Sequence, residues 1–270
     1  MCSGRNHVAR GIHKGKSNIC QKITKGVNAT TVSQAFNSAL QQLWSEGIIY
    51  TNVLLLLTDG PAYMVAAALT LVTLYDRMVH VTCLAHGLHR VCEKIRLEYE
   101  EIDSLIASAN QIFVKSLDRV SGFHFFAPDV PLPPEPVLTR WGTWLLEALY
   151  YSQNFESVYH FLNALDPEDA VCIRRAQELI CGPQVRNQLA FISANSSQLI
   201  RAIASLEAQN LSLVESTGII SGVCDSINAL TGIISLQVQE KLQNILTKIV
   251  GLLFSKTSPL FSETNALQIA

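Results

Sequence analysis

Cysteine and histidine recur at every third position in C-L-A-H-G-L-H-R-V-C, which contains Cys83, His86, His89 and Cys92. Both residue types are usual zinc ligands. On a helix, however, a step of three residues falls short of a full turn by about 60°. Cys83 and Cys92 would then point to opposite sides, and if Cys83 ends a strand, only the two histidines share a helix face. We therefore favour a structural motif that ties a strand to a helix over a zinc site.

Asp59 ends the apolar run V-L-L-L-L-T-D-G. A carboxylate at the carboxyl end of a strand lies at the rim of a sheet, where it can coordinate a hard divalent cation. Phosphoryl transfer by two metal ions needs several such carboxylates around cations about 4 Å apart. The alternative is that Asp59 caps the helix expected to start at Pro61.

Arg140 and Trp141 stand in L-T-R-W-G-T-W, directly after a proline-rich stretch. An arginine beside two tryptophans could stack on bases or bind a phosphate. Aromatic packing at a domain junction is the alternative.

A basic segment leads the chain, because six lysines and arginines precede the first acid, Glu46. Arg10, Lys14 and Lys16 are among them. Such a segment can contact nucleic-acid phosphates, or it can be a solvated pair of strands.

The elements that must position these residues follow from hydrophobic periodicity. The uniformly apolar run Val53 to Leu57 predicts a strand buried on both faces, as in the interior of a parallel sheet. Pro61 favours the first turn of a helix that runs to about Tyr75. The remaining expected elements of this part are a hairpin of His7 to His13 with Asn18 to Thr24, a helix over Val32 to Trp44, and a strand over Met78 to Cys83.

The second half of the chain is predicted to be helical. Apolar residues recur at spacings of three and four from Leu88 onward. The stretch Ala127 to Pro136 holds too many prolines for a helix interior or a central strand, so we expect an extended connector there. After Trp141 the pattern is helical to the end, with breaks at Asp166-Pro167, Gly182-Pro183 and Ser258-Pro259.

Composition is that of a globular protein, with 270 residues, 49% hydrophobic and 16% charged. No stretch approaches the roughly 18 uninterrupted apolar residues of a membrane span, so no membrane partner is expected. The seven cysteines are an odd number without framework spacing. Reduced thiols in the nucleus or cytoplasm fit best.

Three motifs together closely resemble hAT-superfamily transposases and proteins derived from them, nearest to the CGG-triplet-repeat-binding-protein-like group. The motifs are T-D-G-P-A-Y-M, H-V-T-C-L-A-H-G-L-H-R-V and P-L-P-P-E-P-V-L-T-R-W-G-T-W. The three motifs occur in the family's order, and the resemblance covers roughly residues 3 to 165. The resemblance implies an incomplete RNase H-like core followed by an α-helical insertion domain. The fold would therefore be an α/β part followed by a mainly α part. We expect a partial core with the first insertion helices over 1–126, a connector with the Arg-Trp element over 127–144, and a helical domain over 145–270.

The resemblance also implies roles for the site residues. Asp59 matches the second member of an Asp-Asp-Glu set that binds two magnesium ions for DNA cleavage and transfer. Cys83 and His86 match the family's Cys-x-x-His motif, and Arg140 with Trp141 its Arg-Trp element, where tryptophan is thought to help manage DNA ends.

The departures from the family decide the expected function. No Asp precedes Asp59, Glu240 and Glu263 lie in no context that matches the third acid, and the family's zinc finger is absent. We therefore expect a piece of a transposase that is truncated at both ends, catalytically inactive and without a cofactor. Its residual role would be DNA binding or protein interaction, with homo-oligomers through its C-terminal helices. We expect it in the nucleus, with the cytoplasm as the alternative. Two other interpretations are open. In the first, the chain is part of an active magnesium-dependent transposase whose other acids lie outside this chain. In the second, the chain is a helical scaffold that binds nucleic acid nonspecifically through its basic segment.

Overall fold

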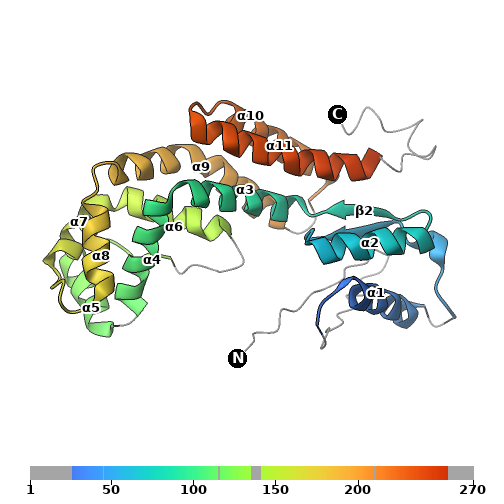
Figure 1. Cartoon of the computed structure of the whole chain (residues 1–270), viewed down its shortest axis with the longest axis horizontal. Coiled ribbons are helices and arrows are strands. Elements are labelled where there is room, and N and C mark those ends of the chain that lie inside the picture. The colour runs from blue at the N-terminus through green and yellow to red at the C-terminus, as the bar shows by residue number, and fades with distance from the viewer. Residues whose placement is uncertain (1–25, 45, 115, 135–140, 209–210, 255–270) are drawn as a thin grey trace. The chain divides into compact units, whose positions relative to one another are not determined.

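The structure is a computed structural model, and it describes residues 26–44, 46–114, 116–134, 141–208 and 211–254. Within them the chain is mainly helical, with eleven α-helices and one small parallel sheet (Figure 1). The expectation of an α/β part followed by a mainly helical part is confirmed at this level. The predicted hairpin and the basic residues Arg10, Lys14 and Lys16 lie outside the described residues.

Two compact units make up the chain. One comprises residues 1–87 and 243–270, and the other comprises residues 88–242. The division predicted from sequence ended the first domain at residue 126, whereas in the structure the helices up to that residue belong to the second unit from residue 88 onward.

The first unit is built on a β-α-β arrangement. Strand β1 (Leu55–Thr58) leads into helix α2 (Ala62–Leu74) and returns as strand β2 (Val79–Thr82). The strands pair in parallel, with Leu55 opposite Val79 and Thr58 opposite Thr82. Helix α1 (Ala29–Leu43) packs on α2, which lies between α1 and the strands (Figure 1). A short 3-10 helix, η1 (Tyr50–Asn52), precedes β1.

Local signals explain where the two helices of this unit begin. The Asn28 side chain accepts from the Thr31 amide at 2.9 Å, and the Thr31 hydroxyl accepts from the Asn28 amide at 3.0 Å. This reciprocal capping box starts α1. Pro61 directly precedes α2 in extended backbone, so the proline ends up at the cap and not in the first turn.

One face of β1 is buried, and the prediction of burial on both faces was wrong. Leu56 belongs to a core cluster with Phe36, Leu71 and Tyr75, whereas Leu55 and Leu57 are exposed. Helices pack on one face of the two described strands. Because side chains alternate between the two faces along a strand, every second side chain of β1 points to the face without helices. A uniformly apolar run cannot reveal this, because both of its faces have the same composition.

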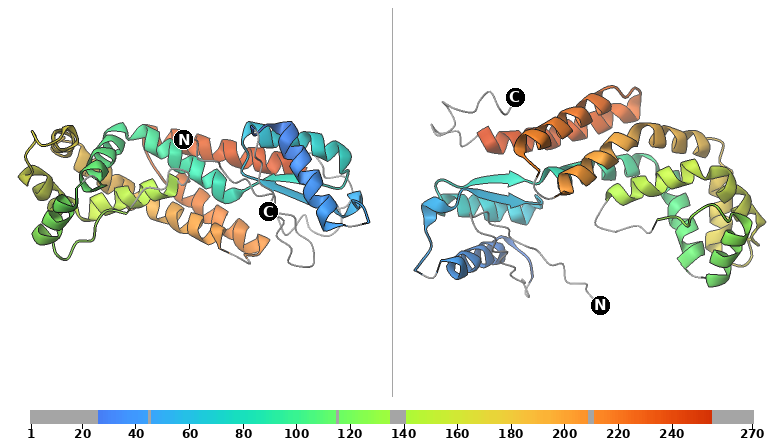
Figure 2. Two further views of the ribbon diagram at one scale, coloured as in Figure 1. Left: turned by 90° about the horizontal axis from the view of Figure 1, so that it is seen from below. Right: turned by 180° about the vertical axis from the view of Figure 1, so that it is seen from behind.

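The second unit is all helical and is ordered by pairwise packing. Helix α4 packs on α8, α6 on α9, and α9 on α10; Figure 2 shows α6 running beside α9. Phe113, Phe123 and Phe161 join α4, α5 and α7, with ring centroids 5.0–5.9 Å apart. The helices are α3 (Leu84–Glu98), which begins before residue 88, α4 (Glu100–Val114), α5 (Leu117–Phe126), α6 (Trp141–Gln153), α7 (Phe155–Ala164), α8 (Val171–Ile180), α9 (Val185–Glu207), α10 (Leu213–Asn228) and α11 (Ile233–Phe254), which ends beyond residue 242.

The connector and the helix breaks agree with the sequence. Residues 127–134 contain neither helix nor strand, as predicted. Asp166-Pro167 lies between α7 and α8, and Gly182-Pro183 lies between α8 and α9. Among the described residues, none of the helices is long and apolar enough to cross a membrane.

Candidate functional site

The carboxyl edge of the two-stranded sheet brings Asp59 and Cys83 to neighbouring strand ends. Each residue directly follows its strand, and the last paired positions are Thr58 and Thr82. The Cys83 amide donates to the Thr58 carbonyl at 2.7 Å, which extends the ladder to the edge. In parallel α/β units, functional groups gather at this edge.

Asp59 does not cap α2, so the capping alternative is wrong. Pro61 occupies the cap position, and the cap has no side-chain hydrogen bond. The Asp59 Oδ1 atom is buried and has no hydrogen-bond partner in the described chain. A buried oxygen without a partner is costly, so this carboxylate is placed by something other than local capping.

Gly60 supplies the turn that holds Asp59 in place. Its φ is 79°, in the left-handed region, and a Cβ there would lie 2.7 Å from the Thr82 Cγ2 atom. Only glycine fits such a turn against the neighbouring strand without strain. The chain therefore leaves β1 tightly packed against the end of β2.

Beneath this edge, His80 and Thr58 form a buried cross-strand pair that the sequence did not reveal. The His80 Nε2 and Thr58 Oγ1 atoms are 2.8 Å apart. Burial lowers the pKa of His80, so the imidazole is neutral at physiological pH. The only signals in the sequence were a histidine inside the predicted strand M-V-H-V-T-C and a threonine at the end of the apolar run V-L-L-L-L-T.

Cys83 and His86 interact at the amino end of α3. Burial acts to raise the pKa of the Cys83 thiol, but hydrogen bonds from the His86 side chain and from the His86 and Ala85 amides outweigh it, so that the pKa is lowered. Cys83 is half-buried and His86 is exposed. The predicted link between strand and helix thus lies where β2 passes into α3.

His89 and Cys92 are not part of that arrangement. The His89 Nδ1 atom accepts from the Gly142 amide at 3.2 Å, and Nε2 lies 3.3 Å from Glu207 Oε1. Cys92 is fully buried, which raises the pKa of its thiol. Within the described ranges, no group of three Cys, His, Asp or Glu side chains could hold a metal ion.

The Arg-Trp element is described only in part. Arg140 falls in 135–140, outside the described residues, and Trp141 is the first residue of α6. The next residue, Gly142, packs against His89, since a Cβ at Gly142 would lie 3.4 Å from His89 Cε1. His89 therefore fixes the backbone that directly follows this element.

A buried acid in the helical unit was missed by the sequence reasoning. Glu147 on α6 is fully buried, and its Oε2 accepts from Asn110 Nδ2 at 3.3 Å. Burial raises the pKa of Glu147 to about 7, against the opposing effects of the Asn110 hydrogen bond and of Arg96. In the sequence, a glutamate within the apolar run W-L-L-E-A-L was the one available signal.

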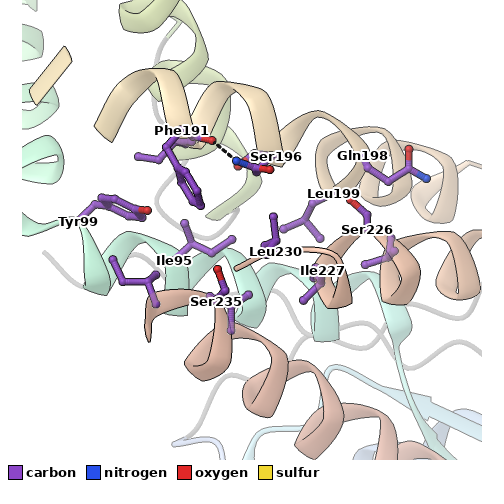
Figure 3. A pocket seen from close by; sticks show the side chains of 15 residues that line it. Ile95, Tyr99, Phe191, Ser196, Gln198, Leu199, Ser226, Ile227, Leu230 and Ser235 are labelled. Carbon is purple, nitrogen blue, oxygen red and sulfur yellow. Dashed lines mark hydrogen bonds between the residues drawn. The ribbon is translucent and has the colours of Figure 1, made fainter. Parts of the chain in front are cut away.

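An apolar pocket lies among the helices of the second unit. Figure 3 shows side chains from α3, α9, α10 and α11 around it, including Ile95, Phe191 and Ile227. The lining is mostly apolar, and its polar members are three serines, the amides of Asn195 and Gln198, and the Tyr99 hydroxyl. Ser235 donates to the Thr231 carbonyl. Nothing in this pocket resembles the titratable groups at the sheet edge.

Comparison with known proteins adds no relative: no family model, curated protein or solved structure matches this chain.

Proposed function

We propose that the chain derives from a hAT-type transposase, with β1, α2 and β2 as part of an RNase H-like core, and that it has no strand-transfer activity. The observation that supports this best is the place of Asp59. It follows a strand of a parallel pair, and its buried Oδ1 atom has no protein partner among the described residues. This is where a metal ligand of such a core would lie, and capping does not explain it.

The proposed lack of activity is supported by the small number of acids in the unit that holds Asp59. Residues 26–87 and 243–254 contain only two other acids, Glu46 and Asp76. Asp76 lies shortly before β2 and so toward the amino edge, about 13 Å away along a four-residue strand. A lone aspartate binds magnesium weakly, because the ion gives up its waters reluctantly. Loss of one member of a set that acts as a unit removes most catalysis.

An active magnesium-dependent transposase is the second candidate. The unpartnered Asp59 Oδ1 favours it, because that oxygen is available to a cation. The missing acids would then come from outside the described residues or from a partner chain, and magnesium would be needed as cofactor.

The two candidates are separated by a cleavage assay on hairpin and nicked DNA with Mg²⁺ or Mn²⁺. We expect no metal-dependent cleavage by the purified chain, and no difference between it and the variants Asp59→Ala and Asp59→Asn. Cleavage that requires the metal and is abolished in both variants would overturn the proposal in favour of the active enzyme.

The residual role that we propose is binding to DNA and to other copies of the chain in the nucleus. Arg10, Lys14, Lys16 and the Arg140-Trp141 element are the proposed DNA contacts. Oligomerisation through the C-terminal helices is supported by exposed apolar side chains, since Val214 on α10 and Leu236 on α11 are each 65% exposed.

A further inference from the structure

The apolar pocket of the second unit contains polar groups of two kinds. Its lining residues run from Ile95 to Val238, so the pocket lies within that unit. Groups of the first kind are already engaged. The Asn195 amide nitrogen donates to the Phe191 carbonyl at 2.8 Å. The Ser235 hydroxyl donates to the Thr231 carbonyl at 2.8 Å. These groups bond to their own helices and are not free to bind a ligand.

The hydroxyls of Tyr99 and Ser196 are of the second kind. Tyr99 is 6% exposed and Ser196 is 4% exposed, yet the described chain gives neither hydroxyl a hydrogen-bond partner. Figure 3 shows the Tyr99 hydroxyl pointing toward the other side chains of the pocket. A buried hydroxyl normally has a partner, because an unpaired one loses its hydration without compensation. The oxygen of a ligand in the pocket would supply that partner.

The rest of the lining limits what such a ligand can be. None of the fifteen lining residues, all of them described, carries a charge. A charged ligand is therefore disfavoured, because a buried ion needs a counter-ion. The cavity has a volume of about 30 Å³ and is partly open to solvent, whereas one water needs about 10–15 Å³. A neutral and mostly apolar molecule of about four to six non-hydrogen atoms fits these limits.

We propose that this pocket is a binding site for small neutral ketones, ethers and alcohols, whose oxygen accepts a hydrogen bond from the Tyr99 hydroxyl. Burial, and then the nearby Glu98, raise the pKa of Tyr99, so the phenol stays protonated and is a donor at neutral pH. The hydrocarbon part of the ligand lies against apolar side chains such as Ile95 and Ile227, which removes it from water. This site is independent of Asp59 and of DNA binding.

Methyl NMR of the full chain, with labelled isoleucine δ1 methyl groups, tests the site with cyclopentanone as the ligand. We expect the Ile95 and Ile227 signals to shift saturably, with a Kd in the millimolar range that so small a ligand can reach. The signal of Ile173 on α8, outside the pocket, should stay unchanged. Cyclopentanecarboxylate, which is charged at neutral pH, should cause no saturable shift. Absence of saturable shifts with cyclopentanone across the millimolar range, or equally tight binding of the carboxylate, overturns the proposal.

Two variants separate the hydrogen bond from simple burial of the ligand. Tyr99→Phe should weaken cyclopentanone binding about two- to tenfold, which is the range for one net hydrogen bond. It should not weaken the binding of methylenecyclopentane, in which a carbon replaces the ketone oxygen. Tyr159→Phe on α7 is the matched control, because Tyr159 does not line the pocket. Urea unfolding verifies that both variants fold, and the two-ligand comparison in the parent chain needs no variant. Equal cyclopentanone affinity of the parent chain and folded Tyr99→Phe would contradict the proposal.

Discussion

Glu147 is a carboxyl group enclosed by the helices of the second unit. Its Oε2 accepts from Asn110, which in turn accepts from the Tyr151 hydroxyl at 3.4 Å, while Oε1 is buried without a partner in the described chain. A buried carboxylate with so few donors is unstable as an anion. The neutral acid is therefore the form that the fold prefers.

This preference makes stability depend on pH with a definite sign. The folded-state pKa of about 7 lies above the ordinary 4.5, so the folded chain holds the proton more tightly than the unfolded chain. The contribution of Glu147 is complete below about pH 4.5 and is lost as the pH rises through about 7. A difference of this size corresponds to about 3 kcal/mol.

We expect Glu147→Gln to remove that dependence, because the amide stays neutral. Between about pH 4.5 and about pH 7.5, the loss in the free energy of unfolding should be smaller by about 3 kcal/mol in the variant than in the parent chain. Urea titrations at several pH values measure it, with the exposed Glu178→Gln as the matched control. Equal pH profiles for parent and Glu147→Gln would show that Glu147 is not the titrating group.

At the scale of elements, β1 shows how burial depends on neighbours. Leu56 is 5% exposed and packs in the core cluster, whereas Leu57, of the same type and in the same strand, is 44% exposed. The difference arises because α2 packs on the strands and covers the Leu56 side. Both residues are leucines in the same apolar run, so the residue type does not tell them apart.

The pair gives a direct test of the one-sided core. We expect Leu56→Ala to cost about 2–5 kcal/mol of unfolding free energy, since it removes buried methyl groups and leaves a cavity. Leu57→Ala should cost less than about 1 kcal/mol, because much of the side chain is already in contact with water. Chemical denaturation of the two variants measures both values, and similar losses would mean that the second face of β1 is also covered.

At the scale of the whole molecule, charge is distributed unevenly along the chain. The net charge is −2, yet every charged residue before Glu46 is basic. Association of such a segment with DNA releases counterions, so binding should weaken steeply with salt.

We expect the triple variant Arg10→Gln, Lys14→Gln and Lys16→Gln to lower the slope of log affinity against log salt by up to about 2.7, since each duplex phosphate that is no longer neutralised accounts for about 0.9. Fluorescence anisotropy with a duplex over a range of salt concentrations provides the slope. Arg174→Gln on α8 is the control, because it removes an exposed charge outside the basic segment. An unchanged slope in the triple variant would assign binding to other residues.

Within the described residues, the order α1, β1, α2, β2 and the helical second half followed from the sequence alone. The apolar run before Asp59, the proline at the start of α2, the cap at Asn28 and the breaks after α7 and α8 are local signals that act within a few residues. The RNase H-like assignment and the DNA-binding role stay predictions, because they depend on resemblance.

Only the tertiary structure decided which partners the candidate residues meet. His89 binds the Gly142 amide, 53 positions away, and so separates from Cys83 and His86, which meet through local contacts at a helix end. Glu147 is buried because α6 packs on α4 and α9, and β1 keeps one face exposed because the helices of its unit pack on the other. The physical reason is that burial and hydrogen-bond partners depend on residues distant in sequence, whereas helix starts, turns and breaks depend on neighbours along the chain.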